Sequence, residues 1–392
     1  MHWPLQRASR AAEASPLAAA ASGDASAARD ALWSGQCNCP YWHGVFGGLY
    51  LRHIRWATHR QLIAAERQAD RLLHGRVDWL QVRREDLDYD GQPEVLVQTA
   101  DLSLCFHPHI GGMLSEWDAR RQDWNLLNVL SRRREAYHEP LLEAEGAATG
   151  PDQPTGDDTG AVRSIHDEPT AKEPGLSALL AFDPHRRGGL QEQLLPPEAS
   201  LPEYAASTFA WTDDFLLGPW QASVEQTKKA VTVRLDHRGR LTMGEQSFPL
   251  RLEKAVTVQR RGPQVAVRYR VENEGEEVSF LLASEWNLNP IQAPDGDDRI
   301  QTLRVKGKKR SLAEAGQAEG VRRAAVVGSA GVALVAELAQ SCTLWHFPVE
   351  SVSNSEGGLE RVNQGACLVF LFDVHLAPSE SRELSLTWTV EE

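Results

Sequence analysis

The sequence predicts a mainly β protein, a large antiparallel β-sandwich preceded by a short helical region. From about Trp220 to the C-terminus, short runs of alternating apolar and polar residues follow one another between turn residues. Many short strands with little helix between them are typical of antiparallel sandwiches. Before residue 78, apolar residues recur at helical spacing instead. We therefore place a helical region at residues 1–78 and the sandwich at residues 79–392.

Size and charge limit the possible partners. The chain has 392 residues, 42% of them hydrophobic, which is enough for a sizeable core. Its net charge of −13 argues against nucleic acid and anionic membrane surfaces as partners. No apolar run approaches the roughly 20 residues of a membrane-spanning helix. Twelve tryptophans favour stacking on sugar rings, although large cores use tryptophan as well.

The cysteine pattern predicts reduced thiols. The five cysteines are odd in number and widely spaced, and no signal peptide opens the chain. Such usage is typical of proteins in a reducing compartment, so we expect a cytoplasmic location. The residues are Cys37, Cys39, Cys105, Cys342 and Cys367.

The helical region has two parts. The first 30 residues are alanine-rich and predict a frayed helix or a helix–loop–helix. From Val45 to Leu73 we expect one helix with two apolar stripes, each of which needs a packing partner. One stripe consists of Leu49, Trp56 and Ile63, and the other of Leu51, Leu62 and Leu73.

The region after residue 78 reads mainly as strands. Leu102, Leu104 and Phe106 alternate with polar residues and share one face of a strand, and a turn and a second strand follow. Residues 126–145 predict a helix. A polar stretch rich in Gly, Pro and Asp predicts a mobile linker around residues 147–162.

The segment "QCNCPYWHGVFGG", residues 36–48, is the densest in reactive side chains. Cys37, Cys39 and His43 could supply three zinc ligands, but no second cysteine pair completes such a site. A cysteine–histidine dyad would need an activating environment that nothing in the sequence indicates. His107 and His109 lie two residues apart much farther along the chain, and we interpret them as turn and strand-edge residues. We therefore expect neither a metal nor a cofactor.

Three groups of carboxylates lie near predicted strand ends and aromatic residues. Glycosidic chemistry needs two carboxyl groups about 5–5.5 Å apart for retention or about 6.5–9.5 Å apart for inversion. The sequence does not show which of these groups face one another, and each reads as a solvated or capping residue. They are Glu116 with Asp118, Asp213 with Asp214, and Glu285.

Several stretches together resemble one known family. They are "QCNCPYWHGVFGGLYLRHIR", "LDYDGQPEVLVQTADLSLCFHPHIGGMLSEWD", "SIHDEPTAKEPGL", "DDFLLGPW" and "HFPVESVSNSEGGLERVNQG". From about residue 31 to the C-terminus, the chain resembles the 4-α-glucanotransferase/α-amylase branch of glycoside hydrolase family 57. The resemblance implies a helical region followed by a galactose-mutarotase-like β-sandwich. It also implies a (β/α)7 barrel upstream that carries a glutamate nucleophile and an aspartate acid/base.

The resemblance implies no catalytic residue in this chain. Only 35 residues precede Gln36, a barrel of this kind needs about 200 or more, and neither catalytic motif occurs. We expect the chain to be the C-terminal portion of such an enzyme, with one apolar stripe of the predicted helix left exposed toward the absent barrel. A further departure is Arg52, where the family often has proline.

The resemblance also implies that residues 36–44, at the start of the segment "QCNCPYWHGVFGG", line a glucan cleft. Trp42 would stack on sugar rings, while Gln36, Asn38 and His43 would form hydrogen bonds to the hydroxyl groups of the sugar. The glycines Gly44, Gly47 and Gly48 either allow backbone to approach ligand or pack against a helix. The implied substrate-binding residues are Gln36, Asn38, Tyr41, Trp42 and His43.

Three functions therefore remain open. The first is the C-terminal portion of an α-1,4-glucan transferase or hydrolase, inactive unless a separate barrel polypeptide supplies the carboxylates. The second is a stand-alone carbohydrate-binding or accessory subunit. The third is a truncated gene product without an independent role. For the first two, the expected ligand is an α-glucan or maltooligosaccharide.

Overall fold

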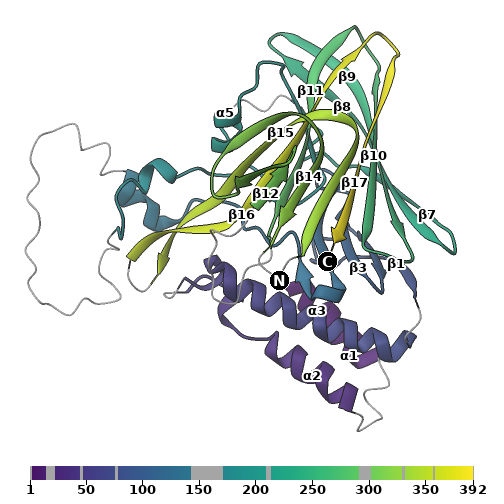
Figure 1. The fold of residues 1–392 in the computed structure, drawn as a ribbon, viewed down its shortest axis with the longest axis vertical. Helices are drawn as coiled ribbons and strands as arrows, with labels where there is room; N and C mark the ends of the chain where they lie inside the picture. Colours follow the sequence, from purple (N-terminus) through teal and green to yellow (C-terminus); the bar gives the residue numbers. More distant parts are fainter. Residues whose placement is uncertain are drawn as a thin grey trace, which may run out of the picture.

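The computed structural model describes residues 2–14, 23–44, 47–75, 78–142, 171–208, 213–290, 302–328, 332–355 and 358–391. It consists of N-terminal helices followed by antiparallel sheets (Figure 1). The mainly β fold with a helical region before it is therefore as predicted. The predicted linker at 147–162 lies outside the described residues, and the domain division at residue 78 stays a prediction.

Three helices form the N-terminal layer. Helices α1 (His2–Ala14) and α2 (Gly23–Ser34) pack against α3 (Arg52–His74), and α2 lies on the side of α3 away from the strands (Figure 1). Alanines dominate this contact because their small side chains let helices approach closely. The predicted helical character of the first 30 residues is confirmed for residues 2–14 and 23–30, while the connection between the two helices lies outside the described residues.

The two-striped helix differs from the prediction in two respects. It begins at Arg52 rather than residue 45, since Gly47 and Gly48 both have left-handed backbone angles. The predicted exposed stripe is wrong as well. Leu62 is 2% exposed and packs with alanines of α1 and α2, while Trp56 packs against the sandwich core. The alanine-rich helices cover the face that we expected to be open.

A five-stranded antiparallel sheet follows, in the order β1-β2-β3-β4-β5. The face shared by Leu102, Leu104 and Phe106 lies in the core, as the alternation predicted. The strands are β1 (Leu80–Glu85), β2 (Glu94–Thr99), β3 (Leu102–His107), β4 (Met113–Ala119) and β5 (Trp124–Asn125).

The remaining strands form a 12-stranded sheet with the path β13-β12-β14-β15-β17-β10-β9-β8-β7, while β11 pairs with β16 and β6. Every strand pair is antiparallel. The strands are β6 (Gln191–Leu195), β7 (Gln221–Gln226), β8 (Ala230–Met243), β9 (Gln246–Gln259), β10 (Gln264–Asn273), β11 (Val278–Leu288), β12 (Thr302–Val305), β13 (Lys308–Ser311), β14 (Gly316–Val327), β15 (Ala333–Ser355), β16 (Gly358–Leu376) and β17 (Ser381–Glu391).

One hydrophobic core contains residues from both sheets. At its centre Trp117, Trp286 and Trp388 contact one another edge to face, with ring centroids 5.2–6.1 Å apart. Each of these rings is completely buried. Such edge-to-face pairs add to the free energy gained by burying the large indole surfaces. These tryptophans therefore serve the core rather than sugar binding.

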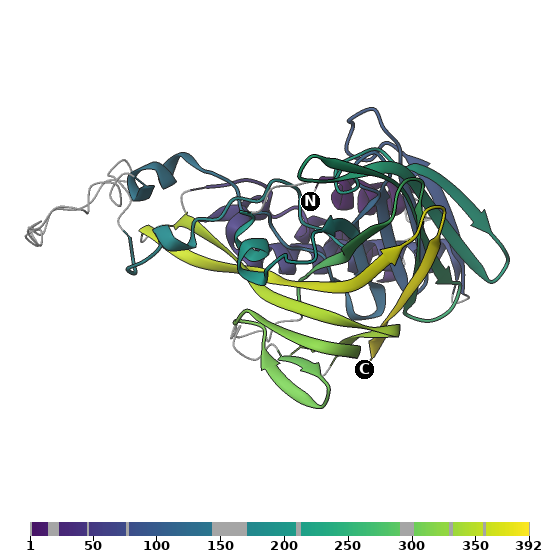
Figure 2. The ribbon, with the colours of Figure 1, turned by 90° about the horizontal axis from the view of Figure 1, so that it is seen from above.

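The β15–β16 hairpin extends beyond the rest of the large sheet (Figure 2). Its far end packs against the segment around Tyr137 through Val352 and Leu359. The prediction of a helix over residues 126–145 is wrong for most of its length. The described part has no helix between 126 and 135 and only a short 3-10 turn, Ala136–His138, before the helical residues 139–142. Its backbone is instead held by neighbouring segments, for example Leu126 N bonded to Trp117 O.

Among the described residues, no helix combines the length and the apolar character needed to cross a membrane.

Candidate functional site

The segment from Gln36 onward leaves α2 and forms a compact turn. Its 3-10 helix Cys39–Tyr41 has a proline in its first turn, and the Tyr41 hydroxyl donates a hydrogen bond to Gly35 O at 2.5 Å. Burial raises the pKa of Tyr41 to about 12, so the phenol stays a donor at neutral pH. Trp42 follows with 54% of its surface exposed. The segment therefore presents one large aromatic face to solvent.

The glycines of this segment shape the loop itself. Gly48 has φ +50°, and a Cβ there would lie 2.2 Å from Trp42 O. That same carbonyl accepts a hydrogen bond from Leu49 N at 2.9 Å. At Gly44, a Cβ would lie 3.3 Å from the Trp42 ring. Both glycines therefore allow the loop to fold onto its own tryptophan, which is a packing role rather than close approach to a ligand.

His43 is held between two tyrosines. Its ring centroid lies 4.9 Å from that of Tyr50 and 5.4 Å from that of Tyr137, both edge to face. The Tyr50 hydroxyl donates to Glu135 Oε1 at 2.5 Å, and burial together with this bond raises the pKa of Tyr50. Among the described residues, His43 Nδ1 has no hydrogen-bond partner. The proposed contact between His43 and sugar hydroxyls stays a prediction.

A cavity of about 350 Å³ opens beside this segment. Of the five predicted binding residues only Tyr41 lines it, while Gln36, Asn38 and Trp42 are exposed on the surface. Burial and the charge of Arg52 lower the pKa of one lining residue, Arg55, to about 9. The lining residues are Pro40, Tyr41, Leu49, Arg55, His59, Ser115, Glu116, Asn125, Leu127, Asn128, Val129, Leu130, Ser131, Arg133, Arg186 and Arg187.

The start of α3 joins this segment to the far hairpin. Arg55 Nη2 donates to Gln364 Oε1 at 2.7 Å, and Arg55 Nη1 donates to Leu49 O at 2.5 Å. Gln364 in turn donates to Tyr50 O at 3.0 Å and to Ser351 Oγ at 2.8 Å. The segment "QCNCPYWHGVFGG" and the sequence "NQG" near the C-terminus are thus neighbours, although more than 300 residues separate them.

Arg52, the position at which the family often has proline, has a specific role here. Its guanidinium donates to Asn289 Oδ1 at 2.6 Å, Asn363 Oδ1 at 3.1 Å and Pro290 O at 2.9 Å. Arg52 is 3% exposed. A proline in the first turn would be compatible with the helix but would lose all three bonds. Arginine at this position therefore ties α3 to the sandwich.

Replacing Gln364 by leucine is expected to lower the free energy of unfolding by about 2–3 kcal/mol, because the buried Arg55 guanidinium and Tyr50 carbonyl lose their partner. Urea unfolding followed by tryptophan fluorescence measures the change. The matched control is Gln246→Leu at an exposed strand end, expected to stay within about 0.5 kcal/mol of wild type. Equal effects of the two substitutions would contradict the role of Gln364.

Glu116 and Asp118 are buried, which corrects the prediction of solvated or capping residues. Arg7 Nη2 donates to Glu116 Oε1 at 2.6 Å, and Asp118 hydrogen-bonds to Glu116. Although burial opposes it, the charge of Arg7 lowers the pKa of Glu116 to about 2, while burial and Glu116 raise that of Asp118. Two carboxyl groups in direct contact leave no room for a glycosidic bond between them. The pair therefore has a structural role.

The other carboxylates are also engaged. Asp213 accepts hydrogen bonds from Leu194 N and Phe215 N at 2.9 Å, and Asp214 accepts one from Arg240 N at 2.8 Å. These two therefore anchor the backbone in different places, as their capping interpretation predicted. Glu285 is instead buried at 1% exposure.

Glu285 lies in a buried polar network that the sequence did not reveal. Its carboxylate accepts hydrogen bonds from Tyr204 at 2.5 Å and from Asn287 at 2.6 Å, with Arg187 at 3.4 Å. Although burial opposes it, the hydrogen bond and charge of His185 help to lower the pKa of Glu285 to about 2. The Glu285 carboxylate is thus hydrogen-bonded to its own neighbours, and the predicted solvated or capping role is wrong.

The described residues contain two groups of potential metal ligands, and neither includes Cys37, Cys39 or His43. None of the five cysteines, all within the described ranges, forms a disulfide. The predicted free thiols are therefore confirmed. His107 ends β3 and Pro108 and His109 lie in the turn that follows, as predicted.

A larger cavity, about 760 Å³, lies at the other end of α3. It is lined by polar and charged residues such as Arg67, Asp70 and Asp101, with Trp79 as its aromatic residue. None of the predicted binding residues contributes to it. The smaller cavity is the better candidate site because it adjoins the segment that carries the resemblance.

Comparison with protein families identifies the chain. Residues 86–386 match the family described as Alpha-amylase/4-alpha-glucanotransferase, C-terminal. Residues 10–69 match the family described as Alpha-amylase/4-alpha-glucanotransferase, middle domain. The chain belongs to the α-amylase/4-α-glucanotransferase group of glycoside hydrolase family 57.

Curated relatives in this family are about twice as long. Alpha-amylase 1 of Dictyoglomus thermophilum is 32% identical over 350 residues, which are 89% of this chain and 47% of the relative. The 4-alpha-glucanotransferase of Thermococcus kodakarensis is 29% identical over 347 residues, 88% of this chain and 46% of the relative. The chain thus spans about half the length of the curated relatives it matches and corresponds to their middle and C-terminal domains.

A solved structure agrees with this assignment of the fold. The crystal structure of 4-alpha-glucanotransferase from Thermococcus litoralis aligns with 100% of this chain and 51% of its own, with a TM-score of 0.74 and 24% identity. The fold of this family 57 chain is therefore that of the middle and C-terminal part of the Thermococcus enzyme.

Proposed function

We propose that this chain forms one wall of an α-glucan-binding cleft in a family 57 enzyme. Membership of a family whose curated relatives are named as α-amylases and 4-α-glucanotransferases supports an α-glucan ligand. The observation that carries the proposal is Trp42, which is 54% exposed in the segment with the family resemblance, next to Pro40 and Tyr41 that line a cavity of about 350 Å³. An exposed indole next to hydrogen-bond donors suits a sugar ring.

The chemistry of the cavity also suits a neutral, hydroxyl-rich ligand. Arg133 and Arg186 at its mouth are exposed and offer several N–H donors, while Ser115 and Asn128 offer oxygen acceptors. The net charge of −13 neither attracts nor repels an uncharged glucan. Tyr41 links the cavity to the segment that carries Trp42.

The proposed role does not include turnover by this chain alone. Retaining or inverting hydrolysis needs two carboxyl groups at defined separations, and the carboxylates discussed above are held by Arg7, by backbone N–H groups or by Tyr204. We infer that the catalytic pair lies outside the residues of this chain, in the barrel that the family resemblance implies. Incubation of the purified chain with maltooligosaccharides is therefore expected to yield no new products by chromatography, and disproportionation or hydrolysis would contradict this.

A second candidate is a stand-alone carbohydrate-binding or accessory subunit. The polar contacts of Arg52 and Arg55 with the hairpin support it, because they hold α3 on the sandwich within this chain. The two candidates differ in what happens on mixing with a barrel polypeptide. Glucan transfer that appears only in the mixture favours the first, and unchanged glucan binding without transfer favours the second. A cytoplasmic location is proposed for both on the free cysteines.

Replacing Trp42 by alanine is expected to weaken maltooligosaccharide binding about tenfold or more, since one stacking interaction of about 1.5 kcal/mol is lost. Affinity electrophoresis in gels containing soluble glucan measures the change. The matched control is Trp33→Ala, which removes another exposed indole, 63% exposed, from helix α2. Wild-type binding by Trp42→Ala, or equal loss in both variants, would contradict a specific role for Trp42.

A further inference from the structure

The turn between β1 and β2 contains three aspartates at alternate positions. Asp86, Asp88 and Asp90 each direct one carboxylate oxygen so that these oxygens all lie within 4.8 Å of one another. Gly91 follows directly with φ +88°. The order D-x-D-x-D-G is the spacing in which calcium loops place their first, third and fifth ligands before an obligatory glycine turn.

The loop departs from the EF-hand pattern in its later positions. The EF-hand places a bidentate glutamate at position 12, which here is Val97, a buried residue of β2. Position 9 is Glu94, an acidic residue at the start of the same strand. Any ion in this loop would therefore take its last carboxylate from position 9 rather than from position 12.

Glu94 supplies an observation that does not depend on the aspartates. It is 0% exposed, and its Oε2 accepts a hydrogen bond from Leu87 N at 2.7 Å, which turns the carboxylate toward the loop. Its other oxygen, Oε1, is buried and forms no hydrogen bond among the described residues, with His107 Nδ1 at 3.4 Å as its ion-pair neighbour. Asp86 Oδ1 is buried without a donor as well. A buried carboxylate oxygen without a donor is costly, and a cation would satisfy it.

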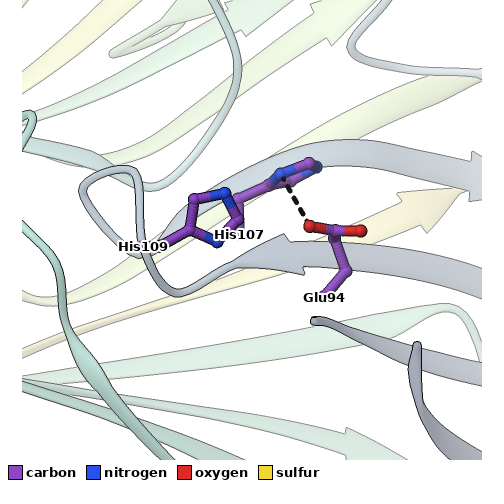
Figure 3. A group of neighbouring side chains, drawn as sticks. All are labelled: Glu94, His107 and His109. Carbon is purple, nitrogen blue, oxygen red and sulfur yellow. Dashed lines mark ion pairs between the residues drawn. The ribbon is translucent and has the colours of Figure 1, made fainter. Parts of the chain in front are cut away.

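Two histidines complete the cluster from the next turn of the sheet. Glu94, His107 and His109 offer ligand atoms that lie within 4.8 Å of one another (Figure 3). His107 Nδ1 lies 3.4 Å from Glu94 Oε1 and 3.9 Å from Asp88 Oδ2. His109 Nε2 lies 2.7 Å from Asp90 Oδ2. The two groups are therefore one continuous cluster that joins the β1–β2 and β3–β4 turns.

The charges in this cluster are unbalanced. Four carboxylates gather in a stretch of nine residues, and the charge of Arg186 interacts with Asp88. Like charges at this spacing destabilise one another, so a bound divalent cation would relieve the repulsion.

We propose that Asp86, Asp88, Asp90 and Glu94 bind one divalent cation of the calcium type. The oxygen-only carboxylate set favours a hard cation over zinc, whose sites prefer nitrogen and sulfur. The imidazoles of His107 and His109 flank the ion and hold the β3–β4 turn against it. The site does not use the Trp42 segment, so its role is to fasten these two turns of the small sheet rather than to bind glucan.

Calcium titration of the chelator-treated full chain tests the proposal. Isothermal titration with calcium chloride is expected to show one ion per chain. At a calcium concentration about 100-fold above its Kd, the midpoint temperature of thermal unfolding is expected to rise by about 4 °C. Asp88→Asn and, separately, the more exposed Asp90→Asn should weaken calcium binding at least tenfold. Far-UV circular dichroism establishes that each variant is folded.

A control variant and a test with zinc distinguish the proposed calcium site from its alternatives. Glu245→Gln, an exposed carboxylate change in the β8–β9 turn, should leave calcium binding and its thermal shift at wild-type values. Absence of any calcium-dependent shift in the wild-type chain would overturn the proposal. A zinc-dependent shift that survives Asp88→Asn and Asp90→Asn but disappears in His109→Asn would also overturn it, because the ligands would then be Glu94 and the histidines.

Discussion

Replacing Arg7 by alanine is expected to lower the free energy of unfolding by about 3–5 kcal/mol, the usual cost of removing one partner from a buried ion pair. Arg7 lies in α1 with 4% of its surface exposed. Its guanidinium contacts Glu66 of α3 at 3.0 Å and Glu116 of β4 at 2.6 Å. Without it, Glu116 would lose the guanidinium that it contacts, and Glu66 would keep only Arg120, whose Nη1 lies 3.9 Å from Glu66 Oε2.

The same arginine joins the helical layer to the small sheet. Glu66 also accepts a hydrogen bond from Gln98 of β2 at 3.0 Å, and Asp118 accepts one from Asn125 at 2.7 Å. The network therefore connects α1 and α3 to β2 and β4 through buried side chains. Loss of Arg7 should loosen α1 first, because that helix contributes no other buried charge to this contact among the described residues.

Two measurements test this. Urea unfolding gives the change in free energy, and hydrogen exchange should show faster exchange of α1 amides than of amides in the large sheet. The matched control is Arg10→Ala on the same helix, whose side chain is 43% exposed and pairs with Glu85. That control should change stability by no more than about 1 kcal/mol. If Arg7→Ala lowers the free energy of unfolding no more than the control does, the buried network does not stabilise the contact between α1 and the small sheet.

The strand pattern of the sandwich could be read from the sequence because alternation reports directly which side faces the core. Along β9, Leu250, Leu252, Val256 and Val258 share the buried face. The helices of the first 30 residues were harder, since alanine favours a helix without indicating which face is buried. The exposed stripe expected on α3 was therefore wrong: the alanines that cover Leu62 carry little hydrophobic signal of their own.

The polar contacts of the candidate site were beyond the sequence for a different reason. Gln364 and Arg55 are 309 residues apart, and one sequence contains no information on such pairing. Trp42 was predicted from the family resemblance of its segment, and its role in binding sugar stays a prediction. Glu116 and Asp118 were read as solvated because carboxylates usually are, and their cation, Arg7, lies in the alanine-rich region that suggested no tertiary role.

Replacing Lys254 by alanine is expected to cost about 3–5 kcal/mol of unfolding free energy, again by leaving one buried charge unpaired. Lys254 is 0% exposed and occupies the core-facing position between Leu252 and Val256 in β9. Its ammonium forms an ion pair with Glu192 of β6. It lies 4.3 Å from the centroid of the Trp220 ring.

The lysine also satisfies backbone groups between the sheets. Its Nζ donates to Gly111 O at 2.7 Å and to Leu190 O at 2.9 Å, while Glu192 accepts a hydrogen bond from Tyr269 at 2.9 Å. Burial lowers the pKa of Lys254 and the Glu192 charge opposes this, so the two groups depend on each other for their charged forms. Replacing Lys254 alone therefore leaves the Glu192 carboxylate buried without its ion-pair partner.

The double variant Lys254→Met, Glu192→Gln separates the ion pair from the burial itself. With neither charge present, most of the loss is expected to be recovered, since paired removal of buried charges is often close to neutral. Lys229→Ala in an exposed turn is the control and should stay within about 0.5 kcal/mol of wild type. Urea unfolding of wild type, Lys254→Met, Glu192→Gln and the double variant gives the coupling energy. A double variant less stable than Lys254→Ala would mean that the carbonyls of Gly111 and Leu190, rather than Glu192, are what the lysine is needed for.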